Sequence, residues 1–392
     1  MKFRSISLLL IAEVAPLTLW FVSSAILPDM LYEYDISAFA QAALTSAVQA
    51  GFVLGALIFA FFNLPDRFDP RKLFALCALA GGAMNLLFLA VEPGSAISIL
   101  IRFLVGALLA GVYPVGMKIA IGWGDKDRGF LVGLLVGALT LGSAAPHLVA
   151  YFGGADWRLT IVLTSLAAMA GGMVCLGVGL GPHHAQSARF DPRVVTTAWT
   201  NVRVRLAIGG YLGHMWELYV MWAWISAALG VSFAASLSPG EATDLAKLTT
   251  FIAIAAGGLA SIFAGRWADQ IGKTEVTIVF MALSGLSAIL TGLTFGGAVW
   301  ISIILVVIWG VTVIPDSAQF SALVAEASPP DQAGSLMTLQ TALGFALTFV
   351  TVQLTPAVVA ITGWPVLLAG LALGPMFGIY SMMKLRRLQR AG

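Results

Sequence analysis

Long apolar runs separated by short polar stretches occupy almost the whole sequence. Each run holds about 20 residues or more, which is the length that a helix needs to cross the hydrocarbon core of a bilayer. Backbone amide and carbonyl groups cannot stay unpaired in lipid, so each run is predicted to be a membrane-spanning helix. The pattern predicts twelve such helices, at about residues 6–31, 39–62, 73–91, 96–122, 130–152, 159–180, 206–229, 246–268, 275–295, 298–325, 333–356 and 363–384.

The longest polar stretch, residues 181–205, divides the twelve runs into two sets of six. We therefore expect an N-terminal domain at 1–180, a connecting loop at 181–205 and a C-terminal domain at 206–392. Of the 392 residues, 59% are hydrophobic and only 10% are charged. A soluble protein carries about 25% charged residues, so the composition excludes a soluble protein and predicts an all-α membrane protein.

The first apolar run has features of a secretory signal peptide. Lys2 and Arg4 precede it, and Ser23-Ser24-Ala25 resembles a cleavage site. The run continues to about Leu31, however, which is longer than the apolar region of a signal peptide. The sequence therefore predicts that this run is retained as the first membrane helix.

Basic residues collect on one side of the predicted membrane. If successive runs cross in alternate directions, that side receives Lys2, Arg4, Arg67, Arg71, Lys72, Lys126, Arg128, Arg189, Arg193, Arg203, Arg205, Arg266, Lys273, Lys384, Arg386, Arg387 and Arg390. The other side receives only Arg158 and Lys247. Cytoplasmic loops carry an excess of lysine and arginine. We therefore expect both termini and the loop at 181–205 to be cytoplasmic, in the inner membrane of a bacterium.

The two halves of the chain repeat short polar features about 200 residues apart. Asp66-Arg67 follows the second apolar run, and Asp269-Gln270 follows the eighth. Tyr113-Pro114 interrupts the fourth run, and Ile314-Pro315 interrupts the tenth. The common spacing indicates a duplicated six-helix unit. Parallel repeats of this kind build one large class of transporters, in which the binding site lies near the midplane between the halves.

The repeated loop after the second run carries a recognisable motif, Gly-x-x-x-Asp-Arg-x-Gly-Arg-x-basic. The second-half copy keeps Gly265, Asp269, Gly272 and Lys273, with Gln270 in place of the arginine. The first-half copy keeps Asp66, Arg67 and Lys72, with Phe62 and Asp69 in the glycine positions and Pro70 in a basic one. With this motif, and with Arg102, Gly106 and Gly111 in the fourth run, the chain resembles the major facilitator superfamily over essentially its whole length.

The resemblance implies twelve transmembrane helices in two pseudo-symmetric six-helix bundles. It also implies a secondary transporter that works as a monomer and needs no cofactor. The first, fourth, seventh and tenth helices of such a transporter line the solute pathway. Four residues of the loop motif would latch the cytoplasmic side, namely Asp66, Arg67, Asp269 and Lys273. Gly133, Gly142 and Pro146 in the fifth run resemble part of the glycine–proline motif of antiporters.

The run at 206–229 places His214 and Glu217 near its middle. A carboxylate there is costly in lipid, so it normally faces a partner or a water-filled cavity. The two residues are three apart and share a helix face. We predict that Glu217 carries a coupling proton, and that His214 modulates it or titrates itself. The alternatives are an aromatic belt with Glu217 near a membrane surface, and a hydrogen-bonded structural glutamate.

Two further charged residues lie inside predicted membrane helices. Arg102 in the fourth run is a fixed positive charge, predicted to bind an anionic substrate or to act on a neighbouring carboxylate. The alternatives are a bond to backbone carbonyls, or a side chain that extends to the membrane surface. Asp316 follows Pro315, which exposes carbonyl groups, and Gln319 lies close behind. We expect this patch to face protons or substrate, or else only to satisfy the broken helix.

Glu13 and Lys118 lie in the cytoplasmic third of the first and fourth runs. An ion pair between them would join two helices that line the pathway in the resembling family. We therefore predict a gate that closes the cytoplasmic side. The alternative is that both side chains extend to the membrane surface without meeting.

Aromatic residues supply most of the predicted substrate lining. If the two halves repeat each other at the spacing of about 200 residues, Trp20 and Phe21 lie roughly opposite Trp222. Such rings bind partly apolar or cationic solutes by stacking and cation–π contacts, although they are equally compatible with plain packing. The predicted substrate-binding residues are Arg102, Trp20, Tyr113, Trp216, Tyr219, Trp222 and Gln319.

These features predict proton-coupled uptake of a small organic or inorganic anion. The alternative is proton-coupled efflux of an amphipathic compound, which the aromatic residues and the antiporter-like glycines favour. The sequence has no Gly-x-x-x-x-Gly-Lys-Ser/Thr motif, so ATP-driven transport is not expected. An enzyme would depend on His214 and Glu217 as its catalytic pair, and we do not expect one. A metal ion, a nucleic-acid partner and a sensor role are not expected either; the partners are a small solute, protons and lipid.

Overall fold

The computed structural model describes residues 1–125, 127–154, 156–184, 191, 193–329 and 332–391. Lys126, Arg189 and the side chain of Arg128 lie outside these described residues. All regular structure that is described is helical. The helices are α1 (Lys2–Leu17), α2 (Val22–Glu33), α3 (Ala38–Phe61), α4 (Leu64–Arg67), α5 (Pro70–Leu87), the 3-10 turn η1 (Phe88–Ala90), α6 (Ala96–Leu109), α7 (Tyr113–Ile121), α8 (Arg128–Gly153), α9 (Trp157–Cys175), α10 (Val194–Thr200), α11 (Val202–Phe233), α12 (Pro239–Ile271), α13 (Lys273–Leu293), α14 (Val299–Val313), α15 (Ser317–Ala327), α16 (Ala333–Gly370) and α17 (Leu373–Ala391).

Four of the predicted runs are each divided between two helices, and the last of them is interrupted at 371–372, between α16 and α17. The fourth run consists of α6 and α7, separated at 110–112, and the tenth consists of α14 and α15, separated at 314–316. The first break lies just before Pro114, in the first turn of α7, and the second contains Pro315. Proline produces such breaks because it lacks an N–H and its ring clashes with the preceding turn. The first run is also broken, at 18–21, between α1 and α2. This break follows Pro16 and was not predicted.

Two helices are much longer than a single crossing requires. α11 is one continuous helix of 32 residues, with His214 and Glu217 in its middle part. α16 holds 38 residues and contains one non-helical position, Gly363, whose φ is 77°. Glycine adopts a positive φ without a steric cost because it has no Cβ. The interruption lies at the predicted start of the last apolar run.

Within the part of the chain that the structure describes, ten helical stretches are long and apolar enough to cross a membrane. The sequence predicted twelve crossings, and the difference arises in two places. Residues Ala333–Arg390 count as one stretch of 58 residues, where the sequence predicted two runs. α11 is not among the ten, because its imidazole, carboxyl, indole and phenol groups lower its mean hydropathy.

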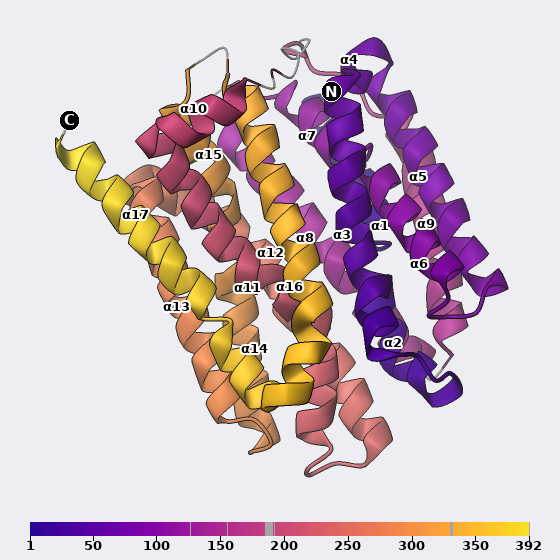
Figure 1. Cartoon of the computed structure of the whole chain (residues 1–392). Helices are drawn as coiled ribbons and strands as arrows, with labels where there is room; N and C mark the ends of the chain where they lie inside the picture. Colours follow the sequence, from indigo (N-terminus) through magenta and orange to yellow (C-terminus); the bar gives the residue numbers. More distant parts are fainter. Residues whose placement is uncertain (126, 155, 185–190, 192, 330–331, 392) are drawn as a thin grey trace.

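By their order along the chain we distinguish an N-terminal group of helices, α1–α9, from a C-terminal group, α10–α17. In Figure 1 the indigo and purple helices of the first group lie to one side of the orange and yellow helices of the second. Within the groups, α3 packs on α6, α5 on α9, and α11 on α17. The two groups meet along α8 with α12 and along α3 with α16, with a smaller contact between α2 and α11.

The same close helix contact occurs once in each group. A Cβ on Gly106 of α6 would overlap the carbonyl oxygen of Val48 on α3. A Cβ on Gly310 of α14 would likewise overlap the carbonyl oxygen of Ala253 on α12. Glycine lets the two backbones approach this closely. Gly310 follows Gly106, and Ala253 follows Val48, by about 200 positions. The two halves of the chain therefore repeat this helix contact at the same spacing as the polar features of the loops.

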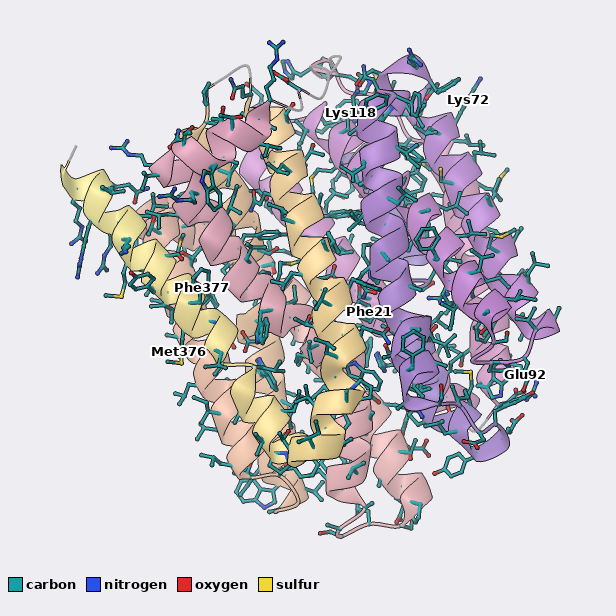
Figure 2. The ribbon with its side chains drawn as sticks, in the orientation of Figure 1. Phe21, Lys72, Glu92, Lys118, Met376 and Phe377 are labelled. Atoms are coloured by element: carbon teal, nitrogen blue, oxygen red, sulfur yellow. The ribbon has the colours of Figure 1, made fainter. Side chains whose placement is uncertain are left out.

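The two ends of the molecule differ in charge. Figure 2 shows Lys72 and Lys118 at one end and Glu92 at the other. Both chain termini lie at the lysine-bearing end (Figure 1), which we call the basic face. At the other end, called the opposite face, Arg158 pairs with Glu33 at 2.7 Å. Both of these side chains are exposed to solvent, so the pair is worth little for stability.

An aspartate begins α5 at the basic face. The Asp69 carboxylate accepts a hydrogen bond from the backbone N–H of Arg71 at 2.9 Å. The Arg71 guanidinium also donates to it, at 2.7 and 3.0 Å. These donors favour the ionised form and lower the pKa of Asp69 to about 2. Asp69 therefore caps the helix and pairs with its first turn.

We expect Asp69→Ala to destabilise the protein by about 1 kcal/mol, because the first turn of α5 loses its cap. Asp69→Asn should cost less, since asparagine still caps but loses the ion pair. The folded pKa lies below the ordinary value near 4. The ionic part of the stability is therefore complete at neutral pH and is lost as the pH falls from about 4 to 2. Thermal unfolding in detergent at pH 7 and pH 3 measures both effects; equal midpoints for wild type and Asp69→Ala at pH 7 would contradict the assignment.

Candidate functional site

Six buried aromatic side chains meet between the two helix groups, and we call them the aromatic cluster. Its members are Trp20, Phe21, Phe52, Tyr219, Trp222 and Phe345. The ring centres of Trp20 and Phe52 are 4.8 Å apart, and those of Phe52 and Phe345 are 4.6 Å apart. Phe21, labelled in Figure 2, lies 5.6 Å from Tyr219 and 5.7 Å from Trp222. The rings come from the first run, α3, α11 and α16, so both groups contribute to the cluster.

The break in the first run places Trp20 and Phe21 in the cluster, and Arg102 stabilises that break. Arg102 on α6 is fully buried. Its guanidinium donates to the carbonyl oxygen of Leu19 at 2.5 Å and to that of Trp20 at 3.4 Å. It also donates to the Asn85 side-chain oxygen at 2.7 Å. Carbonyls that lose their helical partners at the break are thus satisfied by a charged donor. The structure places Arg102 on the protein's own acceptors, which was one of the alternatives that the sequence left open.

Some buried polar atoms on the segments that form the aromatic cluster have no hydrogen-bond partner among the described residues. The indole nitrogens of Trp20 and Trp222 are buried and have no hydrogen-bond partner among the described residues. Gln340, fully buried on α16, has no described partner for either atom of its amide. Buried polar groups are nearly always paired, so each exception needs an explanation. The aromatic cluster thus contains two buried indole donors that no described residue satisfies.

The other predicted lining residues are placed differently. Tyr113 lies partly buried at the start of α7, and Gln319 is buried on α15. Trp216 is 37% exposed. It packs on Gly374 of α17, where a Cβ would lie 2.7 Å from its side chain. Trp216 therefore lies on a different side of α11 from Tyr219 and Trp222, away from the contact between the groups.

Glu217 points into the C-terminal group. One carboxylate oxygen accepts a hydrogen bond from the indole nitrogen of Trp309 at 2.7 Å. The other accepts from the Ser284 hydroxyl at 2.9 Å. The network joins α11, α13 and α14, just as Arg102 with Asn85 joins the first run, α5 and α6 in the other group. Glu217 is buried, and these two hydrogen bonds satisfy both oxygens of its carboxylate inside the protein.

His214 pairs with Asp316 at the break between α14 and α15. The imidazole Nδ1 lies 2.9 Å from a carboxylate oxygen of Asp316, and both side chains are buried. The ring stacks on Tyr211 at 6.1 Å and contacts Phe320 at 5.6 Å. The imidazole Nε2 has no partner in the described part of the chain. The sequence associated His214 with Glu217; the structure turns the two residues toward different neighbouring helices.

Glu13 and Lys118 do not meet in this structure. Glu13 is fully buried on α1, and neither carboxylate oxygen has a partner among the residues described. It faces Gly116 of α7, where a Cβ would overlap its carboxylate. Lys118 instead pairs with Asp66 of α4, the short helix between α3 and α5. In this structure Lys118 therefore belongs to an ion pair within the N-terminal group, and the gate between Glu13 and Lys118 stays a prediction.

The remaining latch residues lie at the basic face. Lys273 pairs with Glu326 at 2.6 Å, joining the start of α13 to the end of α15. Arg67 and Asp269 are exposed. Arg266, one turn before Asp269, lies 5.7 Å from the ring of Phe130 on α8. This contact links the two groups near the basic face.

Several residues of the site were not singled out by the sequence. Phe52, Phe345, Asn85 and Ser284 all lie in apolar runs, where aromatic and small polar residues are common. Asn85 is the one with a usable signal, because an amide inside a membrane helix needs a partner. In the described residues no group of three or more histidine, cysteine, aspartate or glutamate side chains could hold a metal ion.

Comparison with known proteins agrees with this architecture. The family model described as "Major Facilitator Superfamily" matches residues 8–347. Among solved structures, the chain is similar to the crystal structure of a mutant of the nucleoside transporter NupG, with a TM-score of 0.70 and 15% sequence identity. The similarity covers 97% of this chain and 99% of that one. Comparison with curated proteins finds no match.

Proposed function

Because the chain belongs to the Major Facilitator Superfamily, we propose that it is a secondary active transporter that moves a small solute by alternating access. The N-terminal and C-terminal groups would be the two six-helix bundles that rock against each other. The stretch of 58 residues at the C-terminal end is long enough for two crossings at 1.5 Å per residue. With it and α11, the count becomes twelve. Family membership supports a transporter and gives no support to an enzyme.

The basic face would be cytoplasmic. Lysine and arginine residues gather at that end of the molecule together with both termini, as the positive-inside rule requires. The proposal places the chain in the inner membrane of a bacterium, with the opposite face outside. One copy of the chain suffices, because both sides of the aromatic cluster come from the same polypeptide.

We propose the aromatic cluster as the solute site, and its unpaired indole nitrogens are the observation that carries this assignment. The cluster lies where the two groups meet, so relative movement of the groups would expose it to either side. Aromatic rings bind flat solutes by stacking and bind cations through their faces. The indole donors of Trp20 and Trp222 would fix the orientation of such a solute.

The geometry favours an amphipathic solute over the small anion that the sequence ranked first. The sequence predicted that Arg102 binds the anion. In the structure, its guanidinium instead donates to the carbonyls of Leu19 and Trp20 and to the side chain of Asn85. The aromatic cluster itself is formed by uncharged rings. The similar structure is that of a nucleoside transporter; a nucleoside has a flat base and a hydroxylated sugar, and so falls within the proposed class.

Protons would drive the transport. His214 and Asp316 form a buried pair next to the break in the tenth run, and Glu217 lies buried nearby with its own hydrogen bonds. Titratable groups inside a membrane protein mark ion and proton pathways more often than structural ties. Break regions expose carbonyl groups and allow the helix to bend. A proton moving onto or off the pair would therefore change the contacts of α15 with α11.

Proteoliposomes that contain a pH-sensitive dye test the proposal. Nucleosides, lipophilic cations, organic anions and inorganic anions are added outside in turn. We expect a change of internal pH with a flat amphipathic solute, acidification meaning uptake with protons and alkalinisation meaning exchange for protons. Protein-free liposomes are the control. A response to small anions alone would restore the anion interpretation, and transport without any pH change would exclude proton coupling.

A further inference from the structure

A buried ion pair joins the two helix groups near the opposite face. Asp29 lies on α2 in the N-terminal group, and Lys247 lies on α12 in the C-terminal group. The ammonium nitrogen of Lys247 is 2.9 and 2.8 Å from the two carboxylate oxygens of Asp29. The side chains of Lys247 and Asp29 are only 1% and 4% exposed. Neither residue belongs to the aromatic cluster or to the groups proposed to carry protons.

The surroundings of Lys247 come from both groups. Its ammonium is 3.5 Å from the carbonyl oxygen of Gly154, which follows α8 in the N-terminal group. His147 of α8 lies close enough to interact with it electrostatically. Asp244 lies one turn earlier on α12 itself, 3.8 Å away, and its side chain is 50% exposed. Lys247 thus has one buried partner across the interface and a second, exposed carboxylate on its own helix.

Other polar contacts cross the same half of the interface. The Ser46 hydroxyl on α3 donates to the Gln353 side chain on α16 at 2.6 Å. The Gln353 amide nitrogen donates to the carbonyl oxygen of Phe39 at 3.2 Å. Together with the ion pair, these bonds hold α2 and α3 against α12 and α16. A path from the opposite face to the aromatic cluster would have to separate them.

We propose that Asp29 and Lys247 form the gate of the opposite face, and that Lys247 exchanges Asp29 for Asp244 when the gate opens. This inference rests on the alternating access proposed above. Separating a buried ion pair is unfavourable when it leaves a charge without a partner. Asp244 moves with Lys247 because both are on α12, so Lys247 keeps a carboxylate when the groups part. Asp29 would then be exposed to water, which solvates its charge. The exchange makes opening possible without an unpaired buried ion.

Cysteine labelling tests the gate without any solute. Ala43 on α3 is buried and lies one turn from Phe39, which bonds to α16, so Ala43→Cys reports on the closed interface. The two natural cysteines, Cys77 and Cys175, are buried and are replaced by alanine. The reporter protein in sealed vesicles is treated with a membrane-impermeant maleimide from the opposite face. Asp29→Asn is expected to raise the labelling rate at least about tenfold, because the closed state loses its buried ion pair.

Three comparisons make the result specific. Glu33→Gln removes the exposed pair with Arg158, which lies on the same face but within one group, and should leave the labelling rate unchanged. The exchange Asp29→Lys with Lys247→Asp should restore slow labelling, which a misfolded protein would not show. Asp244→Asn should slow labelling several-fold, because the open state loses its carboxylate. If Asp29→Asn fails to fold, Lys247→Met takes its place and should also speed labelling.

The gate is overturned if Asp29→Asn, or Lys247→Met in its place, labels at the wild-type rate. It is also overturned if Glu33→Gln speeds labelling as much as Asp29→Asn does. Partner exchange is overturned if Asp244→Asn leaves the rate unchanged. The assay uses neither a solute nor a pH gradient. A positive labelling result together with the absence of proton-coupled transport would therefore reject the proposed proton coupling and keep both the gate and alternating access.

Discussion

Asparagine in place of Asp316, and glutamine in place of Glu217, are each expected to reduce solute-driven proton movement to the level of protein-free liposomes. Both substitutions keep the size of the side chain and remove its ability to ionise. Asp316 lies 2.9 Å from the imidazole of His214, and no other carboxylate is described at that distance. Internal pH after addition of a transported solute measures the loss. Exchange of labelled for unlabelled solute at equal pH should continue, because it needs no net proton transfer.

Ser284→Ala is the matched control for Glu217. It removes one of the two hydrogen bonds to the carboxylate but keeps the carboxylate itself, so we expect slower proton movement and not its loss. Normal proton movement in Glu217→Gln alone would make Glu217 a structural tie between α11, α13 and α14. Normal proton movement in both Glu217→Gln and Asp316→Asn would show that neither carboxylate takes part in proton coupling.

Arg102→Ala is expected to destabilise the protein by about 2–6 kcal/mol, the summed cost of two buried acceptors that lose their donor. The substitution leaves the carbonyl of Leu19 and the side chain of Asn85 without donors inside the N-terminal group. Each buried unsatisfied group costs roughly 1–3 kcal/mol. We expect a large drop in the midpoint of thermal unfolding in detergent and weak expression.

Arg158→Ala is the control for a change of charge alone. Arg158 pairs with Glu33 at the surface, so its loss should hardly move the unfolding midpoint. A different outcome for Arg102→Ala would be informative. A variant that unfolds at the wild-type temperature but binds an anionic solute more weakly would contradict the structural role and support the anion site that the sequence predicted.

Much of the helical framework can be predicted from the sequence, because apolar run length and proline positions act locally. The breaks in the fourth and tenth runs follow from Pro114 and Pro315. The break at residues 18–21 could not be foreseen in the same way. It depends on Arg102, about 80 residues away, which supplies the donors that the interrupted backbone needs. A local pattern does not contain such a long-range compensation.

The partners of the charged residues were harder to predict than their burial. His214 and Glu217 are three residues apart, and the sequence assigned them to one pathway. On a helix that spacing still turns two side chains by about 60° relative to each other, which is enough to direct them to different neighbours, Asp316 and Trp309. Lys118 similarly pairs with Asp66 and not with Glu13, because the choice between two nearby acids depends on how α4 packs.

The measurement that tests the account most directly is the dissociation constant of a transported solute for wild type, Trp222→Ala and Trp216→Ala. Both tryptophans lie on α11, but only Trp222 belongs to the aromatic cluster, whereas Trp216 packs on α17. Loss of an aromatic contact costs on the order of 1–2 kcal/mol, or about tenfold in affinity. We predict that Trp222→Ala weakens binding by at least about this factor and that Trp216→Ala binds as wild type does. Unchanged affinity in Trp222→Ala would contradict a solute site between the two helix groups.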